Sequence, residues 1–452
     1  MVTIKSKILC LIVCLVEMAW LLVAQIVNSQ FLIIPCLACF LIIAVWASVK
    51  GFAVPVMLFF LPFSPILKLR PGTVSFFTIA LILVYLVYIA MGSRKISITH
   101  FVPGLALIGF VLAVKVIGGY PLENYFILFS LSLLMVPFMV RELDDNYDFY
   151  WLTLFFSIGI ILAAVSAKLL VGFPTISSYV TTHSIFNTLR WSGYYGDPNF
   201  YSAQITAALS GVMIMLLAKN KKRDAFMWTA LLLVLLYCGL LSISKSFFLV
   251  AGVLGLLWVG IIMFRRGNLT AKIVMIVAII VGIIVILSVT VFRDMIDSVI
   301  ARFAGNLTWS DFTTRRTDLW LEYVKGLADD PWVFWFGIGY TDIIIGSQNS
   351  HSTVIQSIYQ LGLIGTILLV LWEICYINTL KGKFKVPKNY ALQAVLLYIG
   401  TLGPWVALDY LFFDEFFILP IYVCAGIRYM TKQKALELDP VTQHNDGDYN
   451  HE

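Results

Sequence analysis

Residues 246–264 read SFFLVAGVLGLLWVGIIMF and contain no charged side chain. A hydrocarbon layer roughly 30 Å thick needs about 20 apolar residues of helix to cross it, so this stretch has the length and composition of a transmembrane helix. Basic residues flank it, with Lys245 before it and Arg265 and Arg266 after it. The stretch therefore predicts a membrane-spanning helix that ends at two polar boundaries.

Similar apolar stretches recur along almost the whole chain. Of its 452 residues 60% are hydrophobic and only 12% are charged, a composition that excludes a water-soluble globular protein. Because lipid cannot satisfy backbone polar groups, the sequence predicts an all-α, polytopic integral membrane helix bundle. We expect about fourteen spans, with about twelve as the alternative because two of them are short or broken by proline. They lie near residues 7–27, 31–49, 52–66, 74–92, 101–118, 122–140, 149–172, 198–218, 226–243, 246–264, 273–292, 352–375, 390–408 and 414–428.

The distribution of basic residues predicts the orientation. If Lys5 and Lys7 are cytoplasmic, most of the 31 lysines and arginines fall on that same side, as the positive-inside rule requires. Both termini are then expected in the cytoplasm, with the chain in the inner (cytoplasmic) membrane. Residues 1–429 form the integral membrane domain in this interpretation, and the polar, acidic residues 430–452 form a disordered cytoplasmic tail. The net charge of +6 is scattered in small clusters, so no nucleic-acid partner is expected.

Metal and disulfide chemistry have little support in the sequence. All seven cysteines fall within or at the ends of apolar spans, and Cys36 and Cys39, spaced as CxxC, lie inside one of them. Such cysteines are more often packing residues than redox or zinc ligands. No cofactor and no metal site are expected.

Two intervals on the predicted outer side, residues 172–199 and 293–350, are longer than a simple connection requires. Long loops between spans often carry function. Within the second loop, residues 314–327 place Leu319, Tyr323 and Leu327 on one stripe. This pattern predicts an amphipathic helix at the membrane surface.

Cationic or potentially cationic residues gather at this same outer face. They are Arg190 in the first loop, Lys245 between two spans, Arg315 and Arg316 in the long loop, and His351 at the start of a span. Each has a plain alternative, such as pairing of Arg190 with Asp197 or contact of the lysine and arginines with lipid phosphates. Together they favour a multivalent anion as partner, because charges at membrane depth need one.

These residues lie in motifs that resemble those of the O-antigen ligase and bacterial polysaccharide polymerase family. The first loop has Arg190, Gly193 and the sequence Asp-Pro-Asn that opens a span at 197–199. Ser244 and Lys245 match a Ser-Arg hairpin, and Arg316 with Trp320 matches an Arg followed four residues later by Trp. His351 precedes LGLIG at 361–365, and FGIGY stands at 336–340. The chain departs from the family pattern at Lys245, Ser352 and Gln360, where Arg, Asn and an acidic residue are usual.

The resemblance implies a glycosyltransferase. Members of the family take a glycan from undecaprenyl diphosphate and transfer it to a hydroxyl at the outer face of the membrane, with inversion and without a metal. Arg190, Arg316 and Arg315 would bind the diphosphate, since guanidinium groups donate paired hydrogen bonds to phosphate oxygens, and Lys245 would add a point charge without that paired contact. His351 would be the base, with an unperturbed pKa near 6.5. Asp197, Asn199 and Trp320 would support the site.

Several alternatives remain open. His183, in the first outer loop, is the rival base. The acceptor is either a second lipid-linked glycan, as in a polymerase of O-antigen, capsule or exopolysaccharide, or lipid A core or protein, as in a ligase; we favour a polymerase. A lipid or polysaccharide exporter is less favoured because no internal repeat is seen and the charges concentrate at one face. A non-catalytic scaffold would not require Arg190, Arg316 and His351 to meet.

Overall fold

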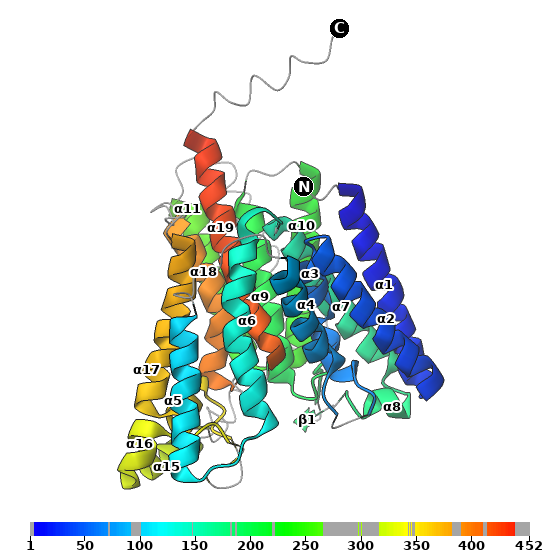
Figure 1. Cartoon of the computed structure of the whole chain (residues 1–452). Helices are drawn as coiled ribbons and strands as arrows, with labels where there is room; N and C mark the ends of the chain where they lie inside the picture. Colours follow the sequence, from blue (N-terminus) through cyan, green and yellow to red (C-terminus); the bar gives the residue numbers. More distant parts are fainter. Residues whose placement is uncertain are drawn as a thin grey trace.

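The chain is described by a computed structural model in which the described residues are 4–70, 73–91, 101–146, 148–180, 183–185, 188–218, 222–264, 297, 300, 316–341, 343, 345, 349–381, 390–409 and 414–438. They form a helical bundle whose long helices run between two ends (Figure 1). The elements are α1 Ile4–Val27, α2 Gln30–Val49, α3 Ala53–Phe60, η1 Leu61–Ile66, α4 Phe76–Met91, α5 Val102–Gly118, α6 Asn124–Asn146, α7 Phe149–Leu170, α8 Pro174–Ser177, β1 His183–Ile185, β2 Thr188–Arg190, α9 Pro198–Leu217, α10 Lys222–Ser242, α11 Lys245–Phe264, α15 Arg316–Asp329, α16 Pro331–Phe336, α17 Thr353–Lys381, α18 Ala391–Leu402, η4 Gly403–Ala407, η5 Asp414–Phe417 and α19 Ile418–Leu438.

The protein is a helical membrane protein. Among the described residues, seven helices are long and apolar enough to cross a membrane, namely Ile4–Val27, Gln30–Val49, Phe149–Leu170, Pro198–Leu217, Lys222–Ser242, Lys245–Phe264 and Thr353–Cys375. Five shorter apolar helical segments accompany them: Ala53–Ile66, Phe76–Met91, Val102–Gly118, Asn124–Pro137 and Ala391–Ala407. The predicted span at 273–292 lies outside the described residues.

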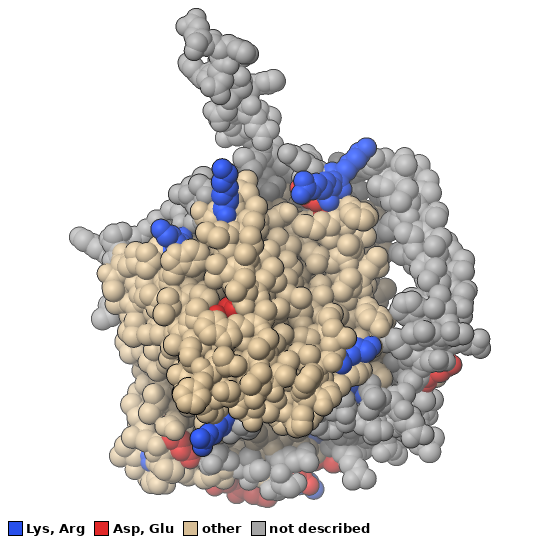
Figure 2. Space-filling view, turned by 90° about the vertical axis from the view of Figure 1, so that its right-hand side faces the viewer, with Lys and Arg blue, Asp and Glu red and all other residues tan. Residues whose placement is uncertain are grey.

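The surface of the bundle is apolar, as lipid contact requires. Phe31, Leu256 and Phe264 are 92%, 77% and 88% exposed, far beyond what a soluble helix tolerates on one face. Figure 2 shows a broad band of uncharged residues on one face of the molecule, interrupted by an acidic side chain, with most of the lysine and arginine side chains above and below it. This distribution matches a hydrocarbon layer bounded by two charged interfaces.

The two ends of the bundle carry different elements. α1 begins and α19 ends at one end, while α8, β1, α15 and α16 lie at the other (Figure 1). Lys7 near the start of α1 forms an ion pair with Asp148, the N-cap of α7, at 3.5 Å between Nζ and Oδ2. We call the end with β1 and α15 the loop end, and it is the end that the sequence predicts to be extracytoplasmic.

The core is formed by helices that are buried on nearly all sides. α9 packs against α7, α10, α11 and α18, and every residue of α3 is buried. α3 approaches α7 so closely that a Cβ at Gly159 would overlap the backbone carbonyl of Phe59. Small residues allow such contacts between membrane helices. The close approach of α3 fixes η1, whose residues are also buried except Pro65, at the loop end of the bundle.

Two features differ from the sequence-based expectations. The predicted tail begins too early at residue 430, because α19 continues to Leu438. Residues 431–438 read TKQKALEL, and lysine, glutamine, alanine, leucine and glutamate are good helix formers whatever their polarity. The first outer loop contains the antiparallel pair β1 and β2, which was not predicted. Arg315 and residues 439–452 lie outside the described residues.

The α3–α7 contact predicts a selective loss of stability. Gly159→Leu should destabilise the protein by about 1–3 kcal/mol, because the added side chain overlaps Phe59 and must push α3 aside. Gly252→Leu in α11 is the matched control, since a Cβ there meets nothing within 4 Å. Thermal unfolding in detergent, followed by size-exclusion chromatography, measures both. Equal midpoints for the two variants would contradict the close approach.

Candidate functional site

Arg190 is held at the end of the short hairpin in the first outer loop. β1 and β2 pair so that His183 lies opposite Arg190 in register. The guanidinium Nε of Arg190 donates to the carbonyl oxygen of Ser242 at 3.2 Å, and the next backbone N–H, of Trp191, donates to the carbonyl of Leu241 at 3.1 Å. These carbonyls belong to the last turn of α10, which has no further helical partner for them. The end of α10 therefore positions Arg190.

The Asp-Pro-Asn motif caps α9 and contacts the next hairpin. The side chain of Asp197 accepts a hydrogen bond from the backbone N–H of Asn199 at 2.7 Å, and Pro198 occupies the first helical turn. The side-chain oxygen of Asn199 accepts from the hydroxyl of Ser244 at 2.7 Å, and that hydroxyl also lies 2.8 Å from the hydroxyl of Ser246. Two motifs that are separated in sequence, at 197–199 and 244–246, thus form one polar network.

Arg316 and Trp320 lie on α15, the helix expected over residues 314–327. Tyr323 and Leu327 of its predicted stripe are buried against Val333, Ile338 and Tyr359. The indole N–H of Trp320 donates to the carbonyl of Ser350 at 2.9 Å. That residue directly precedes His351, whose φ of +49° is an uncommon left-handed conformation. Trp320 therefore fixes the turn that presents the imidazole.

The turn is also held from the helix that follows it. The backbone N–H of Ser350 donates to the side-chain oxygen of Gln356 at 3.2 Å, and the backbone N–H of Thr353 donates to the carbonyl of Leu408 at 2.9 Å. Further along, α17 is broken at Gly362, with φ +68° and ψ 174°. There the N–H groups of Ile338 and Tyr340 donate to the carbonyls of Tyr359 and Gln360 at 3.2 and 3.1 Å.

The break in α17 brings the segments FGIGY (336–340) and LGLIG (361–365) into contact. A Cβ at Gly337 would overlap the backbone at Gly362, and a Cβ at Gly362 would overlap the backbone of residues 335–337. FGIGY and LGLIG are thus directly packed, and the first half of α17 takes its direction from this contact. Since His351 immediately precedes that half-helix, the junction also fixes where the imidazole lies.

The charged groups of these segments form one cluster, which we call the Arg–His cluster and define as Arg190, Asp197, Arg316 and His351. Burial lowers the pKa of Arg190, which Asp197 raises and Arg316 lowers further. Burial also lowers the pKa of Arg316, against the opposing effect of Asp197. The pKa of His351 lies below its usual value because burial desolvates the ring and because Arg316 is close, while Asp197 acts in the other direction. Asp197 therefore influences all three basic groups, and Arg316 influences both Arg190 and His351.

The Arg–His cluster has a surplus of positive charge and an unused donor. Two guanidinium groups are influenced by one carboxylate, and the lowered pKa of His351 favours its neutral form. Arg190 is only 6% exposed, and its Nη2 has no hydrogen-bond partner among the described residues. Buried donors of this kind normally have a partner. The arrangement is suited to binding an anion and to accepting a proton from a nearby hydroxyl.

The remaining predicted residues are placed as follows. Lys245 is the first residue of α11 and directly follows Ser244, so its backbone adjoins the Asn199 network. Arg315 lies outside the described residues, as does the side chain of His183. Among the described residues, no group of three or more histidine, cysteine, aspartate and glutamate side chains is arranged to hold a metal ion.

Sequence reasoning missed a second polar network at the loop end. The hydroxyl of Tyr195 lies 2.7 Å from that of Ser64 and donates to the carbonyl of Leu61 at 3.0 Å. Ser64 in turn donates to Glu415 at 3.3 Å. The signals were a serine in the proline-rich stretch LPFSPI and an acidic residue in an otherwise apolar region, but neither is specific. This network joins the first outer loop to η1 and η5.

Comparisons with known proteins do not assign the chain to a family. No protein-family model matches the chain, and no curated protein matches it in sequence.

Proposed function

We propose that the protein is a glycosyltransferase that takes a glycan from undecaprenyl diphosphate and transfers it to a sugar hydroxyl at the outer face of the cytoplasmic membrane. The proposal rests on one observation: Arg190, Arg316 and His351, from three separate segments, share one electrostatic environment around Asp197. A scaffold protein would not need this convergence. The residues also match the motifs of the polysaccharide polymerase and ligase family that the sequence resembles.

The reaction needs charge stabilisation more than acid catalysis. A diphosphate leaves readily, so its departure requires cationic donors on its oxygens rather than a protein acid. Arg190 and Arg316 supply these donors, and Lys245 and Arg315 add positive charge from adjoining segments. Asp197 favours the charged form of both guanidinium groups, which burial opposes.

His351 acts as the base in this proposal. Its neutral imidazole accepts the proton of the acceptor hydroxyl as that oxygen attacks the anomeric carbon. The bond between this carbon and the diphosphate oxygen breaks, and the lipid diphosphate leaves with the bonding electrons. A single displacement inverts the anomeric centre and needs no metal. Trp320 keeps the base in place through Ser350.

We assign the acceptor to a second lipid-linked repeat unit, which makes the enzyme a polymerase of O-antigen, capsular or exopolysaccharide. Deleting the gene and separating the surface glycan by electrophoresis tests this assignment. A polymerase predicts products that carry a single repeat unit. Full-length glycan left on its lipid carrier would instead mean a ligase that uses lipid A core or protein, and an unchanged glycan would contradict both.

The lowered pKa of His351 predicts the pH dependence of the rate. A base loses activity when it is protonated, so the acid limb of kcat/KM should fall below pH 6.5, the usual value for histidine. In Arg316→Gln the limb should move to higher pH, because a neighbouring positive charge is removed and protonation of the imidazole becomes easier. The rate of turnover of lipid-linked glycan in membrane vesicles, measured as a function of pH, gives the acid limb of the unaltered protein and that of the variant.

Two alanine variants identify the base. His351→Ala should reduce turnover by about 10²–10⁴-fold, the usual contribution of a general base, whereas His183→Ala should retain most of it. The opposite pattern would move the role to His183.

If Arg316→Gln left the acid limb unchanged while lowering the rate, the titrating group would not be His351.

A further inference from the structure

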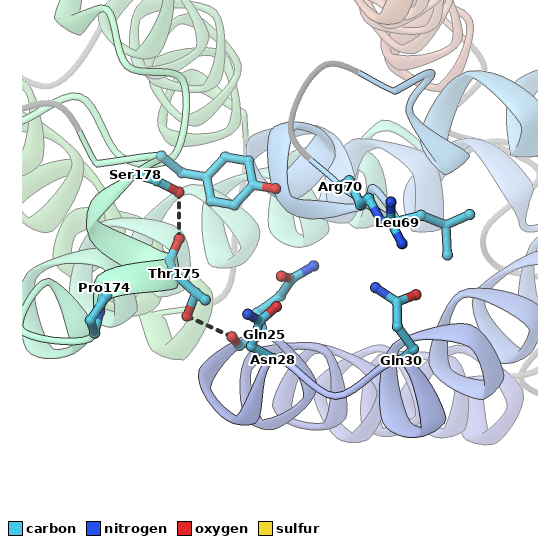
Figure 3. Close-up of a pocket in the computed structure, with 9 residues that line it drawn as sticks. Gln25, Asn28, Gln30, Leu69, Arg70, Pro174, Thr175 and Ser178 are labelled. Carbon is cyan, nitrogen blue, oxygen red and sulfur yellow. Dashed lines mark hydrogen bonds between the residues drawn. The ribbon is translucent and has the colours of Figure 1, made fainter.

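A polar cavity lies at the loop end, and none of its lining residues belongs to the Arg–His cluster. Its volume is about 510 Å³. Its walls come from the turn between α1 and α2, from the residues after η1, and from α8 with the residues that follow it (Figure 3). This volume falls in the roughly 300–1,000 Å³ range of small-molecule sites. We call it the α1–α8 cavity.

Hydrogen bonds connect the three walls, so their relative positions are fixed. The side-chain amide of Gln25, which is 4% exposed, donates to the carbonyls of Ile66 at 2.7 Å and of Lys68 at 3.4 Å. The hydroxyl of Thr175 donates to the carbonyl of Gln25 at 2.7 Å, and that of Ser178 donates to the carbonyl of Thr175 at 2.7 Å. Gln25 thus anchors both other walls to α1.

The lining is rich in groups that donate or accept hydrogen bonds. Asn28 and Gln30 contribute exposed carboxamides, while Gln25, Thr175 and Ser178, whose donors already bind backbone carbonyls, contribute oxygen atoms that can still accept. Arg70 adds one guanidinium, and Figure 3 shows it on the wall opposite Thr175 and Ser178. Among the described residues, the lining contains no carboxylate, which argues against a metal or other cation as ligand.

Sugar hydroxyls match this lining well. Each sugar hydroxyl donates once and accepts twice. The carboxamides of Asn28 and Gln30 can do both, the hydroxyl oxygens of Thr175 and Ser178 can accept, and a guanidinium donates to hydroxyl oxygens or to an acidic substituent. A phospholipid fits less well. Among the described lining residues, only Leu69 and Pro174 contribute apolar side chains beside the aromatic ring of Tyr179, which offers little surface for acyl chains.

The α1–α8 cavity faces the same side of the membrane as the Arg–His cluster. α7 ends at Leu170 and α9 begins at Pro198, and no spanning helix lies between them. Residues 171–197 therefore stay on one side and contribute both Thr175 of the cavity and Arg190 of the cluster. The bond from Tyr195 to Ser64 further joins this loop to η1, which leads to the Arg70 wall.

We propose that the α1–α8 cavity binds a saccharide segment of the glycan at the outer face, beside the transfer site. The assignment of the ligand to the glycan rests on the proposed function. A site of this kind holds part of a sugar chain while its end reacts at the Arg–His cluster. It raises the local concentration of the chain at the cluster, so that one chain is extended repeatedly before release.

The binding test uses the full chain in phosphatidylcholine nanodiscs, with saturation-transfer NMR. The probe is the oligosaccharide mixture released by mild acid from the surface glycan of the same organism. The double variant Gln30→Leu, Arg70→Leu changes two exposed side chains, so the fold should be kept. We expect its dissociation constant for the probe to rise at least tenfold. Arg316→Ala should bind the probe as the unaltered protein does.

Two adjacent serines at the end of α8 control for effects of bulk. Ser178 lines the cavity and Ser177, which is also exposed, does not, so Ser178→Leu should weaken probe binding while Ser177→Leu should not. Equal binding by both serine variants, or by the double variant and the unaltered protein, would overturn the proposal. So would competition by phosphatidylglycerol nanodiscs, because that result would identify a lipid head group as the ligand.

The length of the product separates this proposal from the proposed function. Cavity variants should still join the first repeat units but should give shorter chains on electrophoresis, whereas chains of normal length would contradict a holding site. Normal transfer by both His351→Ala and Arg316→Ala would instead refute the proposed function. In that case, weaker probe binding by the double variant Gln30→Leu, Arg70→Leu would still identify a saccharide site.

Discussion

One carboxylate, Asp197, acts on the pKa values of two guanidinium groups and an imidazole, all of them partly or almost completely buried. Interactions between charges are stronger in such positions than in solvent, so an uneven balance of charge has chemical consequences. Asp197 opposes the effect of burial on the pKa of Arg190 and Arg316, but one carboxylate balances only one of the two positive charges. The remaining positive charge and the buried Nη2 of Arg190 are suited to an anion. Burial and the neighbouring Arg316 lower the pKa of the imidazole, which favours the unprotonated state that a base needs.

The rest of the loop end serves to hold this balance in place. Each residue of the Arg–His cluster is tied to a helix: Arg190 to the end of α10 through Ser242, Asp197 to α9 as its cap, Arg316 to α15 as its first residue, and His351 to α15 through the hydrogen bond from Trp320 to Ser350. Sites that are fixed by rigid elements lose less free energy on binding than sites on free loops. The contact of Gly337 with Gly362 extends this support into α17, where the helix is broken and Gly362 has a positive φ.

The sequence predicts the helices well because lipid is a uniform solvent. A single rule, about 20 apolar residues, gives the α11 boundary to within one residue and most others within a few. It cannot see Gly362, since LGLIG is as apolar as an unbroken span. It also misses β1 and β2, whose three residues each are too short for an alternating pattern. The extension of α19 was missed because polarity was given more weight than helix propensity.

The candidate site was predictable only in part. The motifs named Arg190, Arg316 and His351, but their common environment depends on three loops whose relative placement no local pattern encodes. Asn199 and Ser244 illustrate this point, because each is an ordinary polar residue until the two helix starts meet. The α1–α8 cavity had no sequence signal at all, since Gln25, Arg70 and Thr175 come from three distant segments. Packing between segments, rather than any single stretch, creates it.

The affinity of the purified protein in nanodiscs for undecaprenyl diphosphate, compared with undecaprenyl monophosphate, tests the central claim most directly. If the two arginines hold the diphosphate, the unaltered protein should prefer it, and Arg190→Ala and Arg316→Ala should each weaken its binding by about 10–100-fold, as expected for loss of a charge-assisted contact worth 1.5–3 kcal/mol. Lys325→Ala, which removes an exposed cation from the same helix as Arg316, should have no effect. Equal affinity for the two lipids, or equal binding by all three variants, would contradict the account.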